Sequence, residues 1–230
     1  MGERAKLYVI RGSHAARAGI LMLDHKGIDY DLTTIPTGSQ RLLRLRGFPG
    51  GTVPALVIDG RKVQTNRAIA RALDEIQPDP PLLPSDPERR AAVEEAERWS
   101  DEQLQMDARR LAIAGGLGWS TGFLNGGDDG PLGALLWTTE RRRKRGLRLL
   151  TRVFDVTPET ERELLDRLPA KLDRVDGWIE AGVLDGDELN AADYAIASNL
   201  ALLSYRDDLR PEIARRPAGR LVARVFPPAG

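Results

Sequence analysis

A proline stands where an apolar strand should begin. Residues 48–56 read FPGGTVPAL, and Pro54 lies at the start of a strand predicted over residues 53–59. Proline has no backbone N–H, so within a sheet it is confined to edge strands or to the first residue of a strand. The backbone of Val53 and Pro54 is therefore predicted to face something other than a neighbouring strand, and a ligand could take its hydrogen bonds.

A turn that holds a hydroxyl group comes earlier in the chain. The apolar run 7–10 is followed by Arg11-Gly12-Ser13 and then by a helical pattern over residues 15–26. Ser13 thus takes the position of a helix N-cap, where serine is among the preferred residues. Its hydroxyl is predicted to lie at the positive end of a helix dipole.

The patterning divides the chain into two domains and a linker. Residues 1–78 alternate strands with helices. The strands are expected at 7–10, 29–35, 53–59 and 61–64, the helices at 15–26 and 66–76, and a loop over 40–46. Asp59-Gly60 predicts a hairpin turn, and Asn66 is expected to cap the helix that follows the hairpin. Residues 79–87 read DPPLLPSDP, which breaks regular structure and forms the linker.

Residues 88–230 have helical patterns. We expect one long helix over 88–114, a glycine-rich loop over 115–133, a helix over 157–181 that begins at Thr157, and an apolar helix over 194–205. Asn190 and Asp193 have nearly the spacing of a capping box at the start of the last helix. The predicted fold is an α/β domain with a mixed sheet, followed by an all-α domain.

The composition rules out several kinds of chemistry. The chain contains no cysteine, so it can form neither a disulfide nor a thiolate of its own, and any thiol must come with a ligand. His14 and His25 are its only histidines, and their spacing is not that of metal ligands. We therefore expect no metal cofactor.

Charge and hydropathy limit the partners in the same way. Lysine plus arginine and aspartate plus glutamate both number 34, and this balance argues against a general binder of nucleic acid or of anionic membranes, although it leaves local charged patches open. The basic run 141–145 is interpreted as a solvated helix face. No segment has the apolar length that crosses a bilayer, and the first residues do not form a signal peptide, so a soluble cytoplasmic protein is expected.

Three motifs in register resemble the cytosolic glutathione transferase family over nearly the whole chain. They are Ser13-His14-Ala15-Ala16-Arg17, the segment 48–56, and Asn190-Ala191-Ala192-Asp193. The first resembles the opening helix of serine-type members, the second the segment that holds the family's cis-proline, and the third the cap of a buried helix in the C-terminal domain. The resemblance implies a thioredoxin-like N-terminal domain, an all-α C-terminal domain and a homodimer.

The resemblance also implies a binding site for glutathione or for another low-molecular-weight thiol. Ser13 would donate a hydrogen bond to the thiolate, and Val53 would present its backbone to the ligand beside a cis Pro54. Two structural interpretations stay open, because Ser13 can serve as a helix cap and Pro54 can serve the fold without any catalysis. Tyr8 is a rival hydroxyl, although its place in the strand favours a packed residue.

The expected glutathione site departs from the family at one end. The family's Glu-Ser pair, which binds the γ-glutamyl end of glutathione, falls here on Thr65-Asn66. Loss of the carboxylate removes a contact worth about 1.5 to 3 kcal/mol. Asn66 still offers an amide at a helix N-terminus. Arg41, Arg44 and Arg46 are candidates for a carboxylate of the ligand.

The residues expected to line an electrophile pocket are His14, Trp119 and Phe123, with His14 exposed beside the site. Core packing is the competing interpretation for Trp119 and Phe123. These features predict a detoxifying enzyme that adds or exchanges a thiol cofactor on a small apolar electrophile. The alternative is a non-catalytic binding or interaction protein, which the Thr65-Asn66 departure favours.

Overall fold

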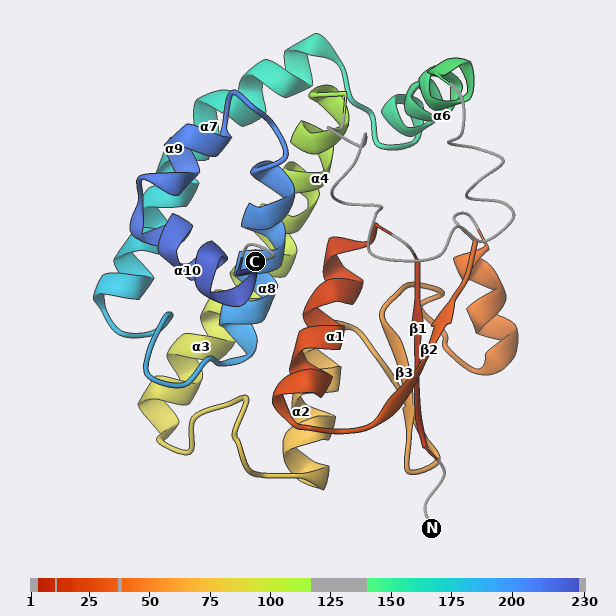
Figure 1. The fold of residues 1–230 in the computed structure, drawn as a ribbon, viewed down its shortest axis with the longest axis vertical. Coiled ribbons are helices and arrows are strands. Elements are labelled where there is room, and N and C mark those ends of the chain that lie inside the picture. The colour runs from red at the N-terminus through yellow and green to blue at the C-terminus, as the bar shows by residue number, and fades with distance from the viewer. Residues whose placement is uncertain (1–3, 11, 37–38, 117–139, 228–230) are drawn as a thin grey trace.

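The N-terminal part of the chain is built on a mixed sheet. The structure, a computed structural model, describes residues 4–10, 12–36, 39–116 and 140–227. Its strands are β1 (Ala5–Val9), β2 (Tyr30–Thr34), β3 (Ala55–Ile58) and β4 (Arg61–Gln64), in the order β2-β1-β3-β4 (Figure 1). β1 pairs in parallel with β2 and antiparallel with β3, and β3 pairs antiparallel with β4.

The predicted hairpin connects β3 to β4. Asp59 and Gly60 both have positive φ values, 47° and 73°. A type I′ turn requires positive φ at both central residues, which explains why the Asp-Gly pair predicts it. The register sets Ala55 opposite Gln64, so Pro54 and Thr65 lie side by side just outside the hairpin.

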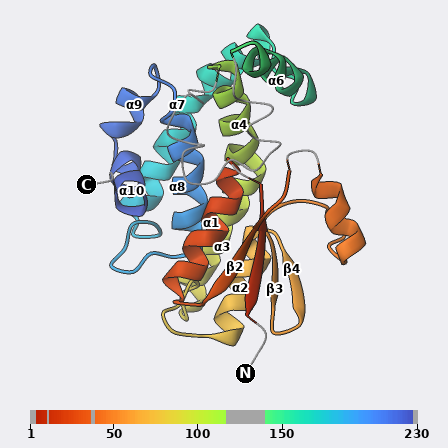
Figure 2. The same cartoon turned by 45° about the vertical axis from the view of Figure 1, so that its right-hand side comes forward.

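Helices cover both faces of the sheet. Helices α1 (His14–His25) and α2 (Asn66–Ile76) lie on the face toward the C-terminal part of the chain, and the 3₁₀ helix η1 (Gln40–Arg46) lies beyond the other face (Figure 2). The expectation of a loop over 40–46 is wrong. Leu43 is 2% exposed and packs with Tyr8 and Phe48, which holds this segment as a short helix against the sheet.

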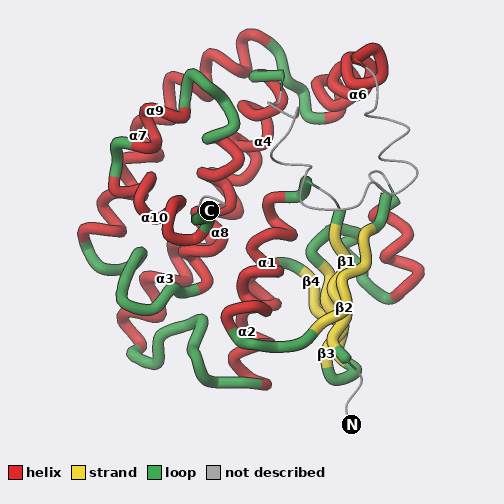
Figure 3. Tube along the Cα trace, in the orientation of Figure 1, coloured by secondary structure: helices red, strands yellow, loops and turns green. Residues whose placement is uncertain are grey.

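The remaining regular structure in the described part of the chain is helical, with loops between the helices, as Figure 3 shows by colour. The helices are α3 (Pro87–Trp99), the π-helical segment η2 (Ser100–Leu104), α4 (Gln105–Ala114), α6 (Glu140–Val153), α7 (Pro158–Glu180), α8 (Ala191–Leu203), α9 (Arg210–Ala214) and α10 (Pro217–Val225). The single helix expected over 88–114 is thus interrupted by η2. The predicted fold class, a mixed-sheet domain followed by a helical one, is confirmed.

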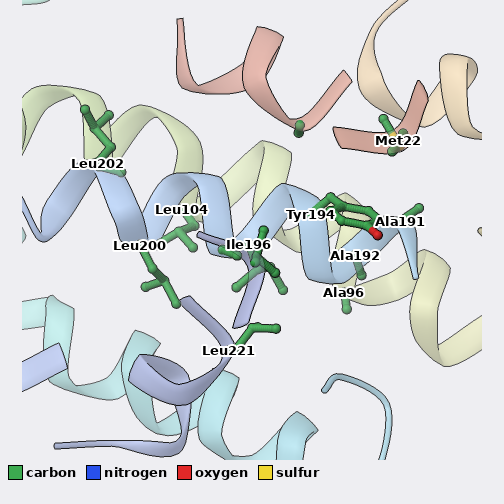
Figure 4. Close-up of a cluster of buried hydrophobic side chains, with 14 of the residues drawn as sticks. Met22, Ala96, Leu104, Ala191, Ala192, Tyr194, Ile196, Leu200, Leu202 and Leu221 are labelled. Carbon is green, nitrogen blue, oxygen red and sulfur yellow. The ribbon is translucent and has the colours of Figure 1, made fainter. Parts of the chain in front are cut away.

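Helix α8 forms the centre of the helical part. Figure 4 shows Tyr194, Ile196 and Leu200 of α8 among side chains from other helices. The predicted capping box is confirmed: Asn190 Oδ1 accepts from the N–H of Asp193 at 3.3 Å, and Asp193 Oδ2 accepts from the N–H of Asn190 at 2.8 Å. Burial raises the pKa of Asp193 to about 6. An acid at this position lets the first turn of a fully buried helix begin without orphan N–H groups.

Helix α1 joins the two parts of the chain. Its last residue, His25, hydrogen bonds through Nδ1 to the Tyr194 hydroxyl on α8 at 3.0 Å. The next residue, Lys26, is 1% exposed, and its Nζ donates to the carbonyl of Gln77 at 2.7 Å and pairs with Asp74 at 2.5 Å. The end of α1 is therefore fixed to α2, to the start of the linker and to α8.

Candidate functional site

The sheet topology brings three separate segments to one end of the molecule. Tyr8 of β1 lies opposite Ala55 of β3, and the strands are antiparallel. The residues that follow β1 and lead to Ser13 therefore lie beside Val53 and Pro54, which precede β3. Thr65 follows β4 and lies beside Pro54 in turn, with its N–H 3.4 Å from the Pro54 carbonyl oxygen. The sequence-predicted residues of the thiol site thus converge.

Ser13 is the N-cap of α1. It has an extended backbone, with φ −80° and ψ 107°, and its Oγ accepts a hydrogen bond from the N–H of Ala16 at 3.2 Å. Because Oγ acts as the acceptor in this contact, the hydroxyl proton stays available for donation to another group. Ser13 is half-buried at the positive end of the helix dipole, a place that favours an anion.

Val53 and Pro54 present a backbone edge toward this end. The Val53–Pro54 peptide bond is cis. Within the described part of the chain, no hydrogen bond involves the N–H or the C=O of Val53. Both groups can therefore pair with an extended ligand in the manner of an added strand.

A glycine in the middle of α1 allows the helix to approach Pro54. A Cβ built on Gly19 would lie 3.3 Å from Pro54 Cβ and 3.5 Å from Asn66 Oδ1. The helix, the cis-proline and the start of α2 are thus in direct contact. Sequence reasoning missed Gly19, although a glycine inside a helical pattern is a signal of close packing.

The cap of α2 is Thr65 and not Asn66, so the expected cap is wrong by one residue. Thr65 Oγ1 accepts from the N–H of Ala68 at 3.3 Å, and Asn66 is the first residue of the helix. Thr65 has φ 80° and ψ 146°, a conformation that a β-branched residue rarely adopts. Asn66 is 7% exposed, and its Oδ1 is buried without a hydrogen-bond partner among the described residues.

The arginines of η1 lie on the other side of the Val53 segment. A Cβ built on Gly51 would lie 3.0 Å from Arg44 Nε and 3.5 Å from the Cα of Arg41, so η1 packs against this loop. Arg41 and Arg44 are exposed and form no ion pair with a described carboxylate. Arg46 stacks on the Tyr8 ring at 5.3 Å. Arg41 and Arg44 are thus placed to meet an anionic group at the edge of the site.

Gln64 holds the loop before Val53 in place. Its Oε1 accepts from the N–H of Gly50 at 2.9 Å, and its Nε2 donates to the carbonyl of Thr52 at 2.7 Å. Sequence reasoning did not identify Gln64, since nothing in the pattern of a short strand distinguishes a positioning side chain from a solvated one. The amide fixes the backbone from which Val53 projects.

His14 is buried, which corrects the expectation that it is exposed beside the site. It is 4% exposed, and its Nε2 has no hydrogen-bond partner among the described residues. Burial and the nearby Arg109 guanidinium of α4 lower the pKa of His14 to about 3. Burial also lowers the pKa of Arg109, which stacks on the Phe154 ring at 5.3 Å. The positive charge of Arg109 beside the N-terminus of α1, which no described carboxylate pairs with, carried no sequence signal, because it depends on helix packing.

Tyr8 is a packed strand residue, as its position predicts. It is 8% exposed and meets Phe48 edge to face, with ring centroids 5.8 Å apart. Trp119 and Phe123 lie outside the described residues.

The described residues contain no group of His, Cys, Asp or Glu side chains suited to a metal ion. None of the described helices has the length and apolar character needed to cross a membrane. A surface pocket of about 440 Å³ lies between the linker and the loop before α8, lined among others by Pro84, Arg89 and Val183. Ser13, Val53 and Thr65 are not part of this pocket.

Comparison with known proteins identifies the N-terminal domain. The model of the family "Glutathione S-transferase, N-terminal domain" matches residues 7–81. A probable maleylacetoacetate isomerase of Caenorhabditis elegans is 38% identical over 68 residues, which are 29% of this chain and 32% of that protein. Glutathione S-transferase Z1 of Arabidopsis thaliana is 38% identical over 92 residues, 39% of this chain and 42% of that protein. The match thus spans about a third to two fifths of the length of these curated relatives.

Solved structures resemble almost the whole chain. A glutathione S-transferase from Rhodospirillum rubrum F11 has a TM-score of 0.70 at 24% identity and covers 97% of this chain and 88% of its own. A glutathione S-transferase from Methylobacillus flagellatus, solved with glutathione bound, has a TM-score of 0.65 at 20% identity and covers 98% and 96%. These structures share the fold of this chain. Residues 7–81 thus belong to the family of glutathione S-transferase N-terminal domains, and the chain as a whole has the fold of solved glutathione S-transferases.

Proposed function

We propose that the chain is a glutathione S-transferase-like enzyme in which Ser13 stabilises the thiolate of bound glutathione. The observation that carries this proposal is the hydrogen bond from the Ala16 N–H to Ser13 Oγ at 3.2 Å. It directs an oxygen lone pair toward the helix and leaves the hydroxyl proton for a ligand. The site also lies at a helix N-terminus, where an anion is favoured.

The residues of the site offer partners to most of the polar groups of glutathione. The N–H and C=O of Val53 are available to the peptide backbone of the ligand, and Asn66 has a buried Oδ1 that awaits a donor such as an ammonium group. Arg41 and Arg44 suit a terminal carboxylate. The carboxylate that would pair with the γ-glutamyl ammonium is missing at Thr65, so affinity is expected to be weaker than in family members with Glu-Ser.

The chemistry requires little beyond this arrangement. Glutathione supplies a thiol, whose ordinary pKa near 8.5 leaves it mostly protonated at neutral pH. Ser13 donates a hydrogen bond at the position of the sulfur, and the dipole of α1 adds a favourable field, so that the ionised form is stabilised. A hydrogen bond to a charged group contributes about 1.5 to 3 kcal/mol.

The substrate is proposed to be a small electrophile held against the helical domain, with His14, Trp119 and Phe123 in or near its pocket. A second reaction on the same site is thiol-dependent isomerisation, since curated relatives include maleylacetoacetate isomerases of Mus musculus and Rattus norvegicus. The partly buried Arg109 and the neutral His14 beside α1 favour an acceptor with a negative charge, because no described carboxylate pairs with Arg109. A homodimer in the cytoplasm is proposed as for the family.

The alternative is a non-catalytic binding protein with the same fold. The observation that favours it is Thr65, which caps α2 and offers no carboxylate. Replacing Thr65 with Glu and Asn66 with Ser restores the family's pair. Under the enzyme proposal this double variant binds glutathione more tightly in calorimetric titration. Unchanged affinity would mean that glutathione does not bind at this place.

The proposal is tested by Ser13→Ala. Loss of the hydrogen bond to the thiolate should lower kcat/KM with glutathione and a model electrophile by about tenfold to 150-fold. It should also raise the pKa of the bound thiol, measured by the ultraviolet absorbance of the thiolate. Thr157→Ala is the matched control. Thr157 also caps a helix, since its Oγ1 accepts from the N–H of Thr160 at 3.2 Å, but it lies away from the site. Equal turnover by the two variants would refute the role of Ser13.

A further inference from the structure

Helix α6 carries a dense group of basic residues that the proposed function does not use. Its sequence is ERRRKRGLRLLTRV. Arg145, Arg148 and Arg152 are exposed, and none of them forms an ion pair with a described carboxylate. Many other arginines of the chain do form such pairs, for example Arg174 with Glu95 at 2.9 Å. No described carboxylate therefore neutralises the charge of Arg145, Arg148 and Arg152.

The exposed face of α6 is apolar as well as basic. Leu149 is 61% exposed and Val153 is 64% exposed, and they lie four residues apart, one turn along the helix. Arg145, Arg148 and Arg152 recur on the same face at helical spacing. Leu147 and Leu150 pack against the core of the protein, which holds α6 in this orientation.

The end of α6 is fixed near the candidate site. Arg110 Nε of α4 donates to the carbonyl of Phe154 at 2.9 Å, directly after the last residue of α6. The neighbouring Arg109, which lowers the pKa of His14, stacks on the ring of Phe154. Figure 1 shows α6 at the edge of the molecule and near the end of the sheet from which α1 begins.

We propose that the outer face of α6, defined by Arg145, Arg148, Leu149, Arg152 and Val153, binds the surface of an anionic lipid bilayer. Basic clusters on an amphipathic helix bind acidic lipid headgroups, and apolar side chains between the basic ones enter the boundary of the acyl chains. Arginine stems extend along apolar surface while their charged ends reach the phosphates. Attachment of this kind does not require a membrane-spanning helix.

A lipid surface fits this face better than other polyanions. A nucleic acid would use the arginines but would leave Leu149 and Val153 exposed to water. The face has no aromatic side chain, the type enriched at the centres of protein interfaces. The attachment would hold the N-terminus of α1 near the bilayer, where lipophilic electrophiles concentrate, although binding itself does not depend on catalysis.

The test is flotation of the full chain with vesicles of phosphatidylcholine alone or mixed with phosphatidylglycerol. We expect binding to the anionic vesicles only, and weaker binding as salt is raised. Each neutralised arginine should lower the partition coefficient about fivefold, so Arg148→Gln with Arg152→Gln should lower it about 25-fold. Leu149→Ser with Val153→Ser should weaken binding to vesicles without changing retention on heparin.

The matched control removes the same charge from another helix. Arg89 and Arg98 of α3 are exposed and form no ion pair with a described carboxylate, so Arg89→Gln with Arg98→Gln changes the net charge equally. Vesicle binding should survive in this control. The proposal is overturned if anionic vesicles do not bind the wild-type protein, if the control loses as much as the α6 variant, or if Leu149→Ser with Val153→Ser binds vesicles as the wild type does. Thermal unfolding of each variant verifies that it is folded.

Discussion

Replacing Thr65 with glycine should make the protein more stable, although threonine is a favourable helix cap. Thr65 has φ 80° and ψ 146°, a region in which a β-branched residue costs about 1 to 3 kcal/mol. Glycine adopts positive φ without this cost. The strain is retained in the native structure because the surrounding strand, turn and helix determine the backbone at this position.

The expected gain follows from three contributions. Relief of strain contributes about 2 kcal/mol. Loss of the bond from the Ala68 N–H to Thr65 Oγ1 costs a few tenths of a kcal/mol, and the added freedom of glycine in the unfolded chain costs about 0.4 to 1 kcal/mol. The net stabilisation is about 1 kcal/mol, which raises Tm by about 2 to 4 °C in a chain of this size.

Thr157 provides the matched control for this prediction. It caps α7 with the same kind of hydrogen bond, but its φ is −117°, which is unstrained. Thr157→Gly should therefore destabilise the protein by about 1 kcal/mol. The two unfolding free energies are compared by urea denaturation with a shared m-value. If Thr65→Gly destabilises the protein as much as Thr157→Gly does, the strain does not exist and the reasoning fails.

Three further substitutions test other parts of the structure. The pKa of His14 is lowered from 6.5 to about 3, so the unfolded chain binds a proton before the folded chain does as the pH falls. The stability advantage of the wild type over His14→Gln should therefore shrink by about 1.4 kcal/mol per pH unit below pH 6.5. A constant difference in unfolding free energy between pH 8 and 4 would contradict burial of a neutral imidazole. Lys26→Met leaves Asp74 without its cation and should cost about 3 kcal/mol in urea denaturation, whereas the exposed Lys62→Met should change stability by less than about 0.5 kcal/mol. Asp193→Ala leaves the N–H groups of Asn190 and Asp185 without an acceptor and should lower the unfolding free energy by at least about 2 kcal/mol. Asp193→Asn should lower it less, because one oxygen remains, and equal losses for the two variants would contradict the capping role.

Features with a local physical cause could be predicted from the sequence. The Asp59-Gly60 turn depends on two residues that tolerate positive φ, the capping box on Asn190 and Asp193, and the cap of α1 on the hydroxyl of Ser13. Each of these interactions spans a few residues, so the amino-acid order is sufficient. The order of strands and helices then followed, and with it the fold class. That Ser13, Pro54 and Thr65 share one site was implied by the family resemblance.

Features that depend on distant contacts were decided by the tertiary structure. His14 looks like an exposed polar residue in sequence, but the folded chain buries it beside Arg109 of α4. Thr65 and not Asn66 caps α2 because the β3–β4 pairing ends at Gln64 and the Thr65 N–H donates to the Pro54 carbonyl. This contact holds Thr65 in a backbone conformation that threonine rarely adopts. The preference of a residue for helix or strand amounts to about 1 kcal/mol, and tertiary packing that fixes several residues at once outweighs it.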